Sequence, residues 1–413
     1  MSNSNVPKIR FPNFNEDWEL KPLKDISLLT SGGTPNRKNK EYWNGTIPWI
    51  TTSEIHFNVI NKAREYISDL GLKNSSAKLF PKNTILIAMY GQGKTRGQCA
   101  ILNIEAATNQ ACAGVIVHKD VDYLFIYHTL VKNYDKLRSL SNDGSQKNLS
   151  LGLLKTFHLA VPNDIAEQQK ISSFFTLIDQ KVKKQLEKIE QLELFKKGMM
   201  EKIFSQEIRF KDKYGKEFPE WETRRLSDFG STYTGLSGKT KEDFGLGEAN
   251  FVTYMNVFSN IRAKSDGVEQ VDIGDGEKQN LVMKEDLLFT TSSETPEEVG
   301  MVSYWGNDED NVYLNSFCFG YRLNDATVKA LFLAYLLRSK EYRAKINLLA
   351  QGSTRYNLSK TELLKIEVKI PSVYEQQKII DYLSILDEKI DKEVEKLVSL
   401  KELKNGFMQK MIF

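Results

Sequence analysis

One stretch of this chain occurs twice, and that repeat constrains the possible folds more than any other feature. The first copy runs from Glu167 to Phe204 and the second from Glu375 to Phe413. A shift of about 208 positions superimposes the two copies without a gap. Self-similarity at a fixed period indicates repeated structural units. The repeat therefore predicts a chain built from two copies of one scaffold.

Apolar residues in each copy follow a heptad pattern, which predicts a coiled coil. Both copies break the pattern at matching places, Gln185 with Glu393 and Lys196 with Lys404. A helix of about 38 residues would be roughly 57 Å long at 1.5 Å per residue. The seam residues are Ile171, Phe175, Ile178, Val182, Ile189, Leu192, Met199 and Ile203 in the first copy, and Ile379, Leu383, Leu386, Ile390, Leu397, Leu400, Phe407 and Met411 in the second.

A long amphipathic helix packed on its own domain is the alternative to a coiled coil. Each copy, however, is long, continuous and free of Pro, and each follows one large globular segment. The simplest way to bury two matching apolar seams is to pack them against each other. We therefore predict that the two helices form a coiled coil within one chain; antiparallel packing would put the two globular segments at its opposite ends.

The segments that precede the two helices also match each other. Ile9-Arg10-Phe11 corresponds to Ile208-Arg209-Phe210, and Asn109 and Cys112 correspond to Asn315 and Cys318. The ends of the two repeats agree better than their interiors, which favours one task performed on two different targets. Further matching features are buried strands at Thr84–Met89 and Asp286–Thr290, helices at Val121–Arg138 and Thr327–Ile346, and the Asn-Leu-Ser sequences at 148–150 and 357–359.

The composition argues against several classes of protein. The N-terminal sequence has no apolar region typical of a signal peptide, and no apolar run approaches the length of a membrane span. Cys99, Cys112 and Cys318 are too few and too scattered for a disulfide framework or a zinc site. We therefore expect a cytoplasmic protein with no membrane contact and no metal. The net charge of +3 permits nucleic-acid binding without requiring it.

The sharpest local motif is Ala88–Thr95, which satisfies a permissive form of the phosphate-binding P-loop with Lys94 and Thr95 in the reactive places. A P-loop opens directly into a helix, whereas residues 96–102 resemble a glycine turn leading into a strand. The matching loop, Thr291–Gly300, contains no Lys. We therefore interpret the motif as a loop that offers polar and basic side chains to a polyanion, with an ordinary solvated hairpin as the alternative.

Other loops pair up between the two halves and carry basic, amide and hydroxyl side chains. Thr30–Lys40 matches Thr234–Asp243, and Asn142–Ser150 matches Gln351–Ser359. Such side chains contact phosphates and base edges, although the serines at 150 and 359 are equally suited to be helix caps. The candidate DNA-contacting residues are Thr34, Arg37, Lys38, Gln92, Lys94, Thr95, Arg96, Gln98, Ser145 and Lys147 in the first segment, and Ser237, Lys239, Lys241, Ser292, Ser293, Ser353, Arg355 and Tyr356 in the second.

Patterns typical of enzymes are weak. The four histidines fall in unrelated contexts, and none of them recurs in the second half. The sequence contains no Cys/His ligand spacing, no nucleophile elbow and no Gly-rich cofactor motif with its downstream acid. These observations indicate a binding protein rather than a catalyst.

The tandem organisation and its motifs strongly resemble the specificity subunit of type I restriction-modification systems, the HsdS family. The resemblance rests on the Pro and Glu-Gln-Gln-Lys-Ile sequences at Pro162–Ile171 and Pro371–Ile379, the paired helices, the Asn-Leu-Ser segments, and the strand and glycine loop at Ile85–Gly97. It spans nearly the whole chain. The Arg355-Tyr356 pair has no counterpart in the first half, where Gln146-Lys147 stands instead.

The resemblance implies an α+β chain with two α/β target-recognition domains, at residues 1–166 and 208–374. Two helical segments, at 167–207 and 375–413, would form the antiparallel coiled coil. Each domain would read one half of a bipartite target in double-stranded DNA. The helices would set the spacer and dock two methyltransferase subunits, with restriction and translocase subunits completing the assembly. This chain would hold no cofactor, since S-adenosylmethionine, ATP and Mg²⁺ are expected in the partner subunits.

Two other functions remain open from the sequence. One is a P-loop nucleotidase with a coiled-coil arm, which requires nucleotide binding at Lys94. The other is a scaffold that joins proteins through its helices and binds no DNA.

Overall fold

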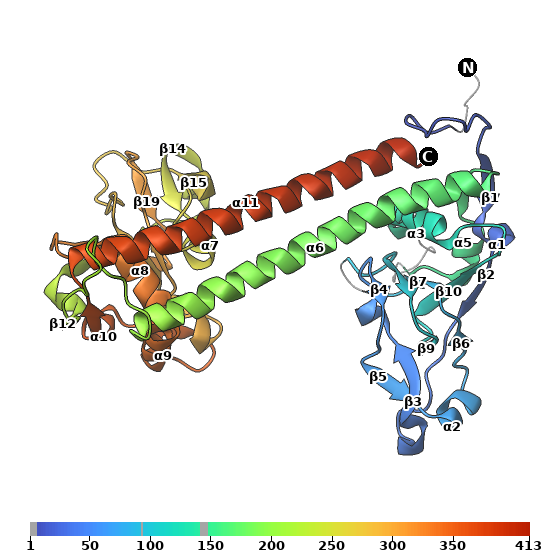
Figure 1. Ribbon diagram of the computed structural model, residues 1–413, viewed down its shortest axis with the longest axis horizontal. Helices are drawn as coiled ribbons and strands as arrows, with labels where there is room; N and C mark the ends of the chain where they lie inside the picture. Colours follow the sequence, from blue (N-terminus) through green and yellow to red (C-terminus); the bar gives the residue numbers. More distant parts are fainter. Residues whose placement is uncertain (1–5, 92–93, 141–147) are drawn as a thin grey trace. The chain divides into compact units, whose positions relative to one another are not determined.

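The computed structural model describes residues 6–91, 94–140 and 148–413, which form two compact units. Unit 1 comprises Met1–Glu187 and Glu395–Phe413, and unit 2 comprises Lys188–Val394. Each unit therefore contains one globular segment together with part of each long helix, α6 (Ile165–Phe204) and α11 (Val373–Met411) (Figure 1). Both long helices begin two residues before the predicted starts at Glu167 and Glu375.

Unit 1 is built on a five-stranded sheet of order β2-β10-β7-β8-β4 and a four-stranded sheet of order β5-β3-β9-β6. A short pair, β1 with β11, joins the start of the segment to its end. The strands are β1 (Glu19–Pro22), β2 (Ser27–Ser31), β3 (Trp43–Ile50), β4 (Val59–Ile60), β5 (Glu65–Ile67), β6 (Leu79–Phe80), β7 (Ile85–Ala88), β8 (Cys99–Leu102), β9 (Ala106–Thr108), β10 (Cys112–Val117) and β11 (His158–Val161); the helices are α1 (Leu23–Ile26), α2 (Asp69–Lys73), α3 (Tyr123–Lys132), α4 (Tyr134–Ser139) and α5 (Leu151–Lys155).

Unit 2 repeats this plan with a four-stranded sheet of order β13-β20-β16-β18 and a three-stranded sheet of order β15-β14-β19. The pair β12 with β23 corresponds to β1 with β11. The strands are β12 (Glu222–Arg225), β13 (Gly230–Thr234), β14 (Phe244–Val252), β15 (Val268–Val271), β16 (Leu287–Thr290), β17 (Ser292–Ser293), β18 (Val302–Tyr304), β19 (Val312–Leu314), β20 (Cys318–Leu323), β21 (Ala350–Gln351), β22 (Tyr356–Leu358) and β23 (Glu367–Ile370); the helices are α7 (Tyr254–Ser259), α8 (Ala330–Arg338), α9 (Lys340–Leu348) and α10 (Lys360–Leu364).

The buried strand β7 lies between two apolar cores, which explains its continuous apolar sequence. Successive side chains of a strand point to opposite faces of a sheet. Ile85 and Ile87 accordingly join the core that contains α3 and the first half of α6, while Leu86 and Ala88 join a core beneath the second sheet. Strand β16 is divided in the same way between two cores of unit 2. The predicted α+β class is confirmed.

The Glu-Gln-Gln sequence that opens each long helix fastens the helix to its own globular segment. Glu167 is buried and accepts hydrogen bonds from Arg10 at 2.6 and 2.8 Å. The next residue, Gln168, donates to the Pro162 carbonyl and accepts from the Asp122 backbone at the start of α3. Glu167 thereby fixes the N-terminal segment, and Gln168 fixes α3 against α6.

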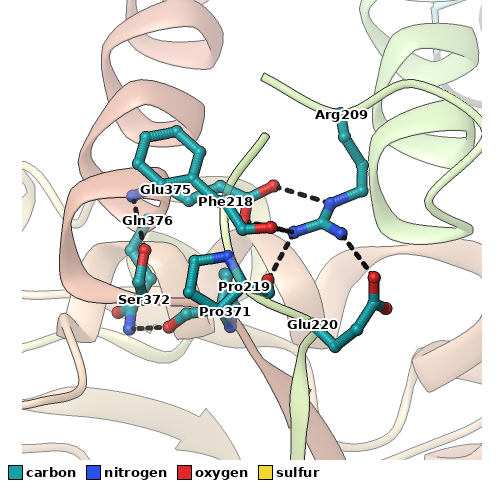
Figure 2. Close-up of polar contacts among 8 residues, drawn as sticks. All are labelled: Arg209, Phe218, Pro219, Glu220, Pro371, Ser372, Glu375 and Gln376. Atoms are coloured by element: carbon teal, nitrogen blue, oxygen red, sulfur yellow. Dashed lines mark hydrogen bonds and ion pairs between the residues drawn. The ribbon is translucent and has the colours of Figure 1, made fainter. Parts of the chain in front are cut away.

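We call these contacts of the Glu-Gln-Gln sequence, Arg to Glu and Gln to the Pro carbonyl, a clamp. The same clamp recurs at the start of α11. Arg209 donates to both oxygens of the buried Glu375, at 3.2 and 3.0 Å, and also to the carbonyls of Phe218 and Pro219 (Figure 2). These bonds to Glu375 raise the pKa of Arg209, so the guanidinium remains charged. Gln376 donates to the Pro371 carbonyl, as Gln168 does to that of Pro162. The recurring sequence is therefore a recurring structural clamp.

The lysines at two of the breaks in the heptad pattern, Lys196 and Lys404, form ion pairs between the two long helices. In unit 1, Lys404 of α11 binds Asp179 of α6. In unit 2, Lys196 of α6 binds Asp387 of α11, which also accepts a hydrogen bond from Tyr335. Within each unit, one helix contributes its N-terminal part and the other its C-terminal part, so the two run antiparallel there.

The two helices predicted after β10 and β20 are each broken in the structure. The first divides into α3 and α4 at Asn133, and the second into α8 and α9 at Ser339. Ser339 has extended backbone angles, φ −68° and ψ 157°, which no α-helical residue adopts. The helical periodicity of the sequence continues across both breaks and did not reveal them. Among the described residues, no helix is both long enough and apolar enough to span a membrane.

Candidate DNA-binding loops

Three loops of unit 1 leave the same edge of its larger sheet. Strand β10 pairs antiparallel with both β2 and β7, with Ala113 opposite Ser31 and Cys112 opposite Ala88. The ends of β2 and β7 and the start of β10 therefore meet at one edge (Figure 1). We call the loops at this edge, residues 32–38, 89–91 with 94–98, and 109–112, the recognition surface of unit 1.

Unit 2 has the corresponding arrangement. Strand β20 pairs antiparallel with β13 and β16, with Phe319 opposite Thr234 and Cys318 opposite Thr290. The recognition surface of unit 2 accordingly comprises residues 235–241, 291–300 and 315–318. The first loop is anchored alike in both units, since Gly33 donates to the Thr108 carbonyl and Leu236 donates to the Leu314 carbonyl, each at 2.8 Å.

The central loop of each surface is the same tight turn, which we call the Asn-x-x-Cys turn. In unit 1 the Asn109 side chain accepts from the Ala111 backbone at 3.1 Å, and the Cys112 backbone donates to the Asn109 carbonyl at 3.2 Å. In unit 2 Asn315 makes the equivalent bonds to Phe317 and Cys318, each at 2.9 Å. Asn suits such a turn because its short side chain bonds to the backbone two residues later.

The turn is also tied to the loop after the buried strand. The Met89 backbone donates to the Ala111 carbonyl, and the Thr291 backbone donates to the Phe317 carbonyl, each at 2.8 Å. Both cysteines are buried, and burial raises the pKa of each thiol, so they remain neutral packing groups. The turn is thus a common frame, and its two central residues differ between the units: Gln110-Ala111 in one and Ser316-Phe317 in the other.

The Asn-Leu-Ser segments lie against the same loops. Leu149 donates its backbone N–H to the Met89 carbonyl at 3.0 Å, and Leu358 donates to the Thr291 carbonyl at 2.8 Å. The serine that follows each leucine is a helix cap. Ser150 accepts from the Leu153 backbone at the start of α5, and Ser359 accepts from the Glu362 backbone at the start of α10. Of the two interpretations left open by the sequence, capping is the one with a contact in the structure.

Replacing Ser359 with Ala is expected to lower the free energy of unfolding by about 1 kcal/mol, the usual cost of losing an N-cap. DNA affinity should stay unchanged, because the hydroxyl is occupied by the helix. Chemical unfolding and DNA titration of the same variant would test this. A loss of DNA affinity without a loss of stability would instead make the serine a DNA contact.

Several predicted residues lie exposed on or beside these surfaces. Arg37 forms an ion pair with Glu65 and stacks on Trp43, with its guanidinium carbon 3.8 Å from the ring centre. Arg355 stacks on Phe317 at 5.2 Å, which joins it to the Asn-x-x-Cys turn. The other exposed candidates are Lys38, Lys94, Ser237, Lys241 and Ser353.

Other predicted residues are engaged by the fold. Arg96 donates to the Arg138 carbonyl, and its Nε is buried without a hydrogen-bond partner among the described residues. The side chain of Lys239 is 7 % exposed and binds Glu277, and hydrogen bonds from Lys239 and Gln279 lower the pKa of Glu277 to about 2. Ser292 and Ser293 are buried in β17, where Ser293 donates to Glu298. These side chains shape the loops from within.

The remaining candidates either are partly exposed or lie outside the described residues. Thr34 donates to Gln110, and Gln98 contacts His56 at 3.2 Å, so both side chains brace neighbouring loops. Thr95 and Tyr356 are half-buried. Gln92, Ser145 and Lys147 lie outside the described residues, and their predicted contacts remain predictions.

The sequence analysis missed the two residues at the centre of each Asn-x-x-Cys turn. Gln110, Ser316 and Phe317 are exposed, and Phe317 presents 52 % of its surface to solvent. A usable signal was present, because the flanking Asn and Cys match between the halves while the residues between them differ. A turn whose first and last residues match between the two halves while its central residues differ is what we expect of a fixed backbone frame that presents different side chains to DNA.

A P-loop is not formed at Lys94. The loop after β7 runs into strand β8 rather than a helix, so the helix N-terminus that holds phosphate in a P-loop is missing. Within residues 6–91, 94–140 and 148–413, no cluster of His, Cys, Asp and Glu is suited to hold a metal ion.

Comparison with known families identifies this architecture. The family model described as the type I restriction modification DNA specificity domain matches residues 15–194 and again residues 219–402. The chain belongs to this family. The two matched ranges correspond to the two repeats found in the sequence, so the resemblance stated from the motifs is confirmed.

Some relatives in the family match nearly the whole chain, and others match part of it. The MjaIX specificity subunit of Methanocaldococcus jannaschii is 26 % identical over 96 % of this chain and 93 % of its own length. The EcoR124I/EcoR124II specificity subunit of Escherichia coli is 32 % identical over 39 % of this chain and 41 % of its own length. The crystal structure of an S subunit from M. genitalium covers 99 % of both chains with a TM-score of 0.57 at 16 % identity, which shows a shared fold.

Proposed function

We propose that this chain is the DNA specificity subunit of a type I restriction-modification complex, and that each unit reads one half of a bipartite target in double-stranded DNA. One observation carries the proposal. Both units present the same Asn-x-x-Cys frame at the same edge of the same sheet, with different side chains at its centre. Equivalent frames with different contact residues are what two readers of different half-sites require.

Catalysis is assigned to partner subunits. Two methyltransferase subunits would dock on this chain and supply S-adenosylmethionine, and restriction and translocase subunits would supply the ATP- and Mg²⁺-dependent steps. This chain would contribute DNA contacts and docking surfaces in the cytoplasm, with no reaction of its own. The family membership and the relatives named as specificity subunits support this division of labour.

A genome-wide map of methylated adenines tests the proposal. The chain and its cognate methyltransferase subunit would be expressed together in a host that has no adenine methylation. The expected result is a two-part motif with a fixed gap that disappears when this chain is omitted. A soluble, assembled complex that methylates no such motif would overturn the proposal and favour the scaffold function.

The long helices are expected to set the gap between the half-sites. Inserting seven residues into each helix, after Glu187 in α6 and after Val394 in α11, would add roughly 10 Å of helix at 1.5 Å per residue. That length corresponds to about three base pairs at 3.4 Å each. The methylation map should show a longer gap with both half-sites unaltered. An altered half-site with the original gap would show that the helices do not set the spacing.

A further inference from the structure

Unit 2 contains a cleft that none of the predicted DNA-contacting residues lines. Its volume is about 760 Å³, within the range of small-ligand sites. The junction of α8 and α9, the segment after α7, and parts of α6 and α11 form its walls. The cleft is connected to the loop at 291–300 through Arg343. This residue lines the cleft and donates hydrogen bonds to the carbonyls of Glu297, Val299 and Gly300.

Two arginines in the wall, Arg338 and Arg343, form no ion pair with a carboxylate among the described residues, although the charge of Asp387 acts on Arg338 from a distance. Arg338 donates to the backbone carbonyls of Val302, Val257, Phe258 and Asn260. Arg343 donates to three carbonyls and to the Asn347 side chain. Burial lowers the pKa of each arginine to about 10. Buried charges are normally paired, so two cations held only by neutral oxygens leave excess positive charge at the cleft.

Between the arginines, Ser339 provides a second and independent indication of a ligand. Ser339 is one of the residues that line the cleft, it is 3 % exposed, and its buried Oγ has no hydrogen-bond partner among the described residues. Ser339 is also the N-cap of α9, a helix of nine residues, yet its hydroxyl makes no capping bond. A buried hydroxyl without a partner costs free energy that a bound acceptor would recover.

The N-terminus of α9 adds a favourable field for an anion. The first N–H groups of a helix have no partner within it, and the helix dipole is positive at that end. Lys340 is exposed at the first position of α9 and lines the cleft, as do Lys197 and Lys264. Four acidic residues also line it, on α6 and α11, but Asp387 among them is occupied by Lys196 and Tyr335.

We propose that this cleft binds a phosphate group, carried by a free nucleotide or by the DNA backbone. A phosphate offers several acceptor oxygens and up to two negative charges, which matches two arginines, a free hydroxyl and a helix N-terminus better than a single carboxylate does.

Neither Arg338 nor Ser339 is repeated at the matching position of unit 1. Phe125 packs on Trp18 in unit 1 as Phe332 packs on Trp221 in unit 2, so the two phenylalanines are equivalent. Counting from them, Val131 of unit 1 corresponds to Arg338, and Lys132 corresponds to Ser339.

Calorimetric titration of the full chain with inorganic pyrophosphate at constant ionic strength tests the site. We expect pyrophosphate to bind at one saturable site. Ser339→Ala should lower the affinity for pyrophosphate about tenfold, which corresponds to about 1.4 kcal/mol. Lys340→Gln, a change at an exposed position, should weaken it in the same direction. Ser399→Ala removes an exposed hydroxyl from α11 outside the cleft and should leave the affinity unchanged. Absence of a saturable site, or equal affinities in Ser339→Ala and Ser399→Ala, would overturn the proposal.

The source of the phosphate is distinguished with the same variants. If DNA supplies it, Lys340→Gln weakens binding to all duplex sequences alike and lowers the slope of log affinity against log salt by about one. If a nucleotide supplies it, Ser339→Ala weakens ATP binding and the salt dependence of DNA binding is unchanged. Failure of the variants to alter either ligand's binding would contradict a phosphate site. The nucleotide result would stand even if sequence recognition by this chain were disproved.

Discussion

Replacing Arg209 with Ala should lower the free energy of unfolding by about 3–5 kcal/mol, the usual cost of leaving a buried charge without its partner. Glu375 is fully buried, and both of its oxygens accept hydrogen bonds from Arg209. The variant would leave this carboxylate buried without its partner and would also release the carbonyls of Phe218 and Pro219 (Figure 2). Urea unfolding followed by circular dichroism would measure the loss.

A matched control is available on the same unit. Arg225 pairs with Glu367 at 3.6 Å, but both side chains are more than half exposed. Arg225→Ala should therefore change stability by only about 0.5 kcal/mol, as exposed ion pairs contribute little. The double variant Arg209→Met with Glu375→Met should be more stable than Arg209→Ala, because it leaves no unpaired buried charge. Equal losses in Arg209→Ala and Arg225→Ala would show that the clamp does not stabilise the fold.

The architecture was predictable because it rests on periodic signals that one sequence carries. The heptad positions and their shared breaks predicted two paired helices, and the breaks at Lys196 and Lys404 proved to be sites of ion pairs with Asp387 and Asp179. The Arg and Glu of the two clamps could be recognised in the sequence as residues that recur in both halves, but the sequence did not show that each Arg contacts its Glu. A pair separated by 157 residues, such as Arg10 and Glu167, has no local pattern that reveals it.

The candidate site was predicted less well, because residue type alone does not show which way a side chain turns. Lys239 and Arg96 lie in basic loops, yet Glu277 and the Arg138 carbonyl hold them. Ser292 and Ser293 are buried by pairing of β17 with β22, a short strand pair that no periodicity marks. Phe317 was not among the predicted contacts, because most aromatic residues belong to a core and the sequence alone does not show that this one is exposed.

The breaks in the predicted helices show the same limit. Ser339 lies within a continuous helical pattern, and only tertiary packing shows that its backbone is extended there. The cleft proposed to bind phosphate depends on that break, because α9 starts there and Ser339 lines the cleft. The helical periodicity of the sequence therefore located the helical region but not the break at Ser339, on which the proposed phosphate site depends.

Replacing Phe317 with Ala should alter the half-site read by unit 2 and leave the half-site read by unit 1 unchanged. Phe317 is exposed at the centre of the Asn-x-x-Cys turn and carries Arg355 on its ring. Removing it deletes an apolar contact surface and releases the guanidinium. Loss of one base contact is worth roughly 1–3 kcal/mol, so methylation of the original target should fall by about 5- to 150-fold. The measurement is the methylated-adenine map of the variant complex.

The turn itself should survive this change, because its hydrogen bonds come from Asn315 and the backbone. Tyr214→Ala, at an aromatic residue that is 75 % exposed in the same unit and outside the recognition surface, is the matched control and should leave the map unaltered. Exchanging the pair, Ser316→Gln with Phe317→Ala, places the centre of the unit 1 turn on the unit 2 frame and should change the second half-site again. If both variants methylate the original motif at the original rate, the turn is a structural element and the half-site is read by other loops. If the first half-site changes instead, the assignment of one half-site to each unit is wrong.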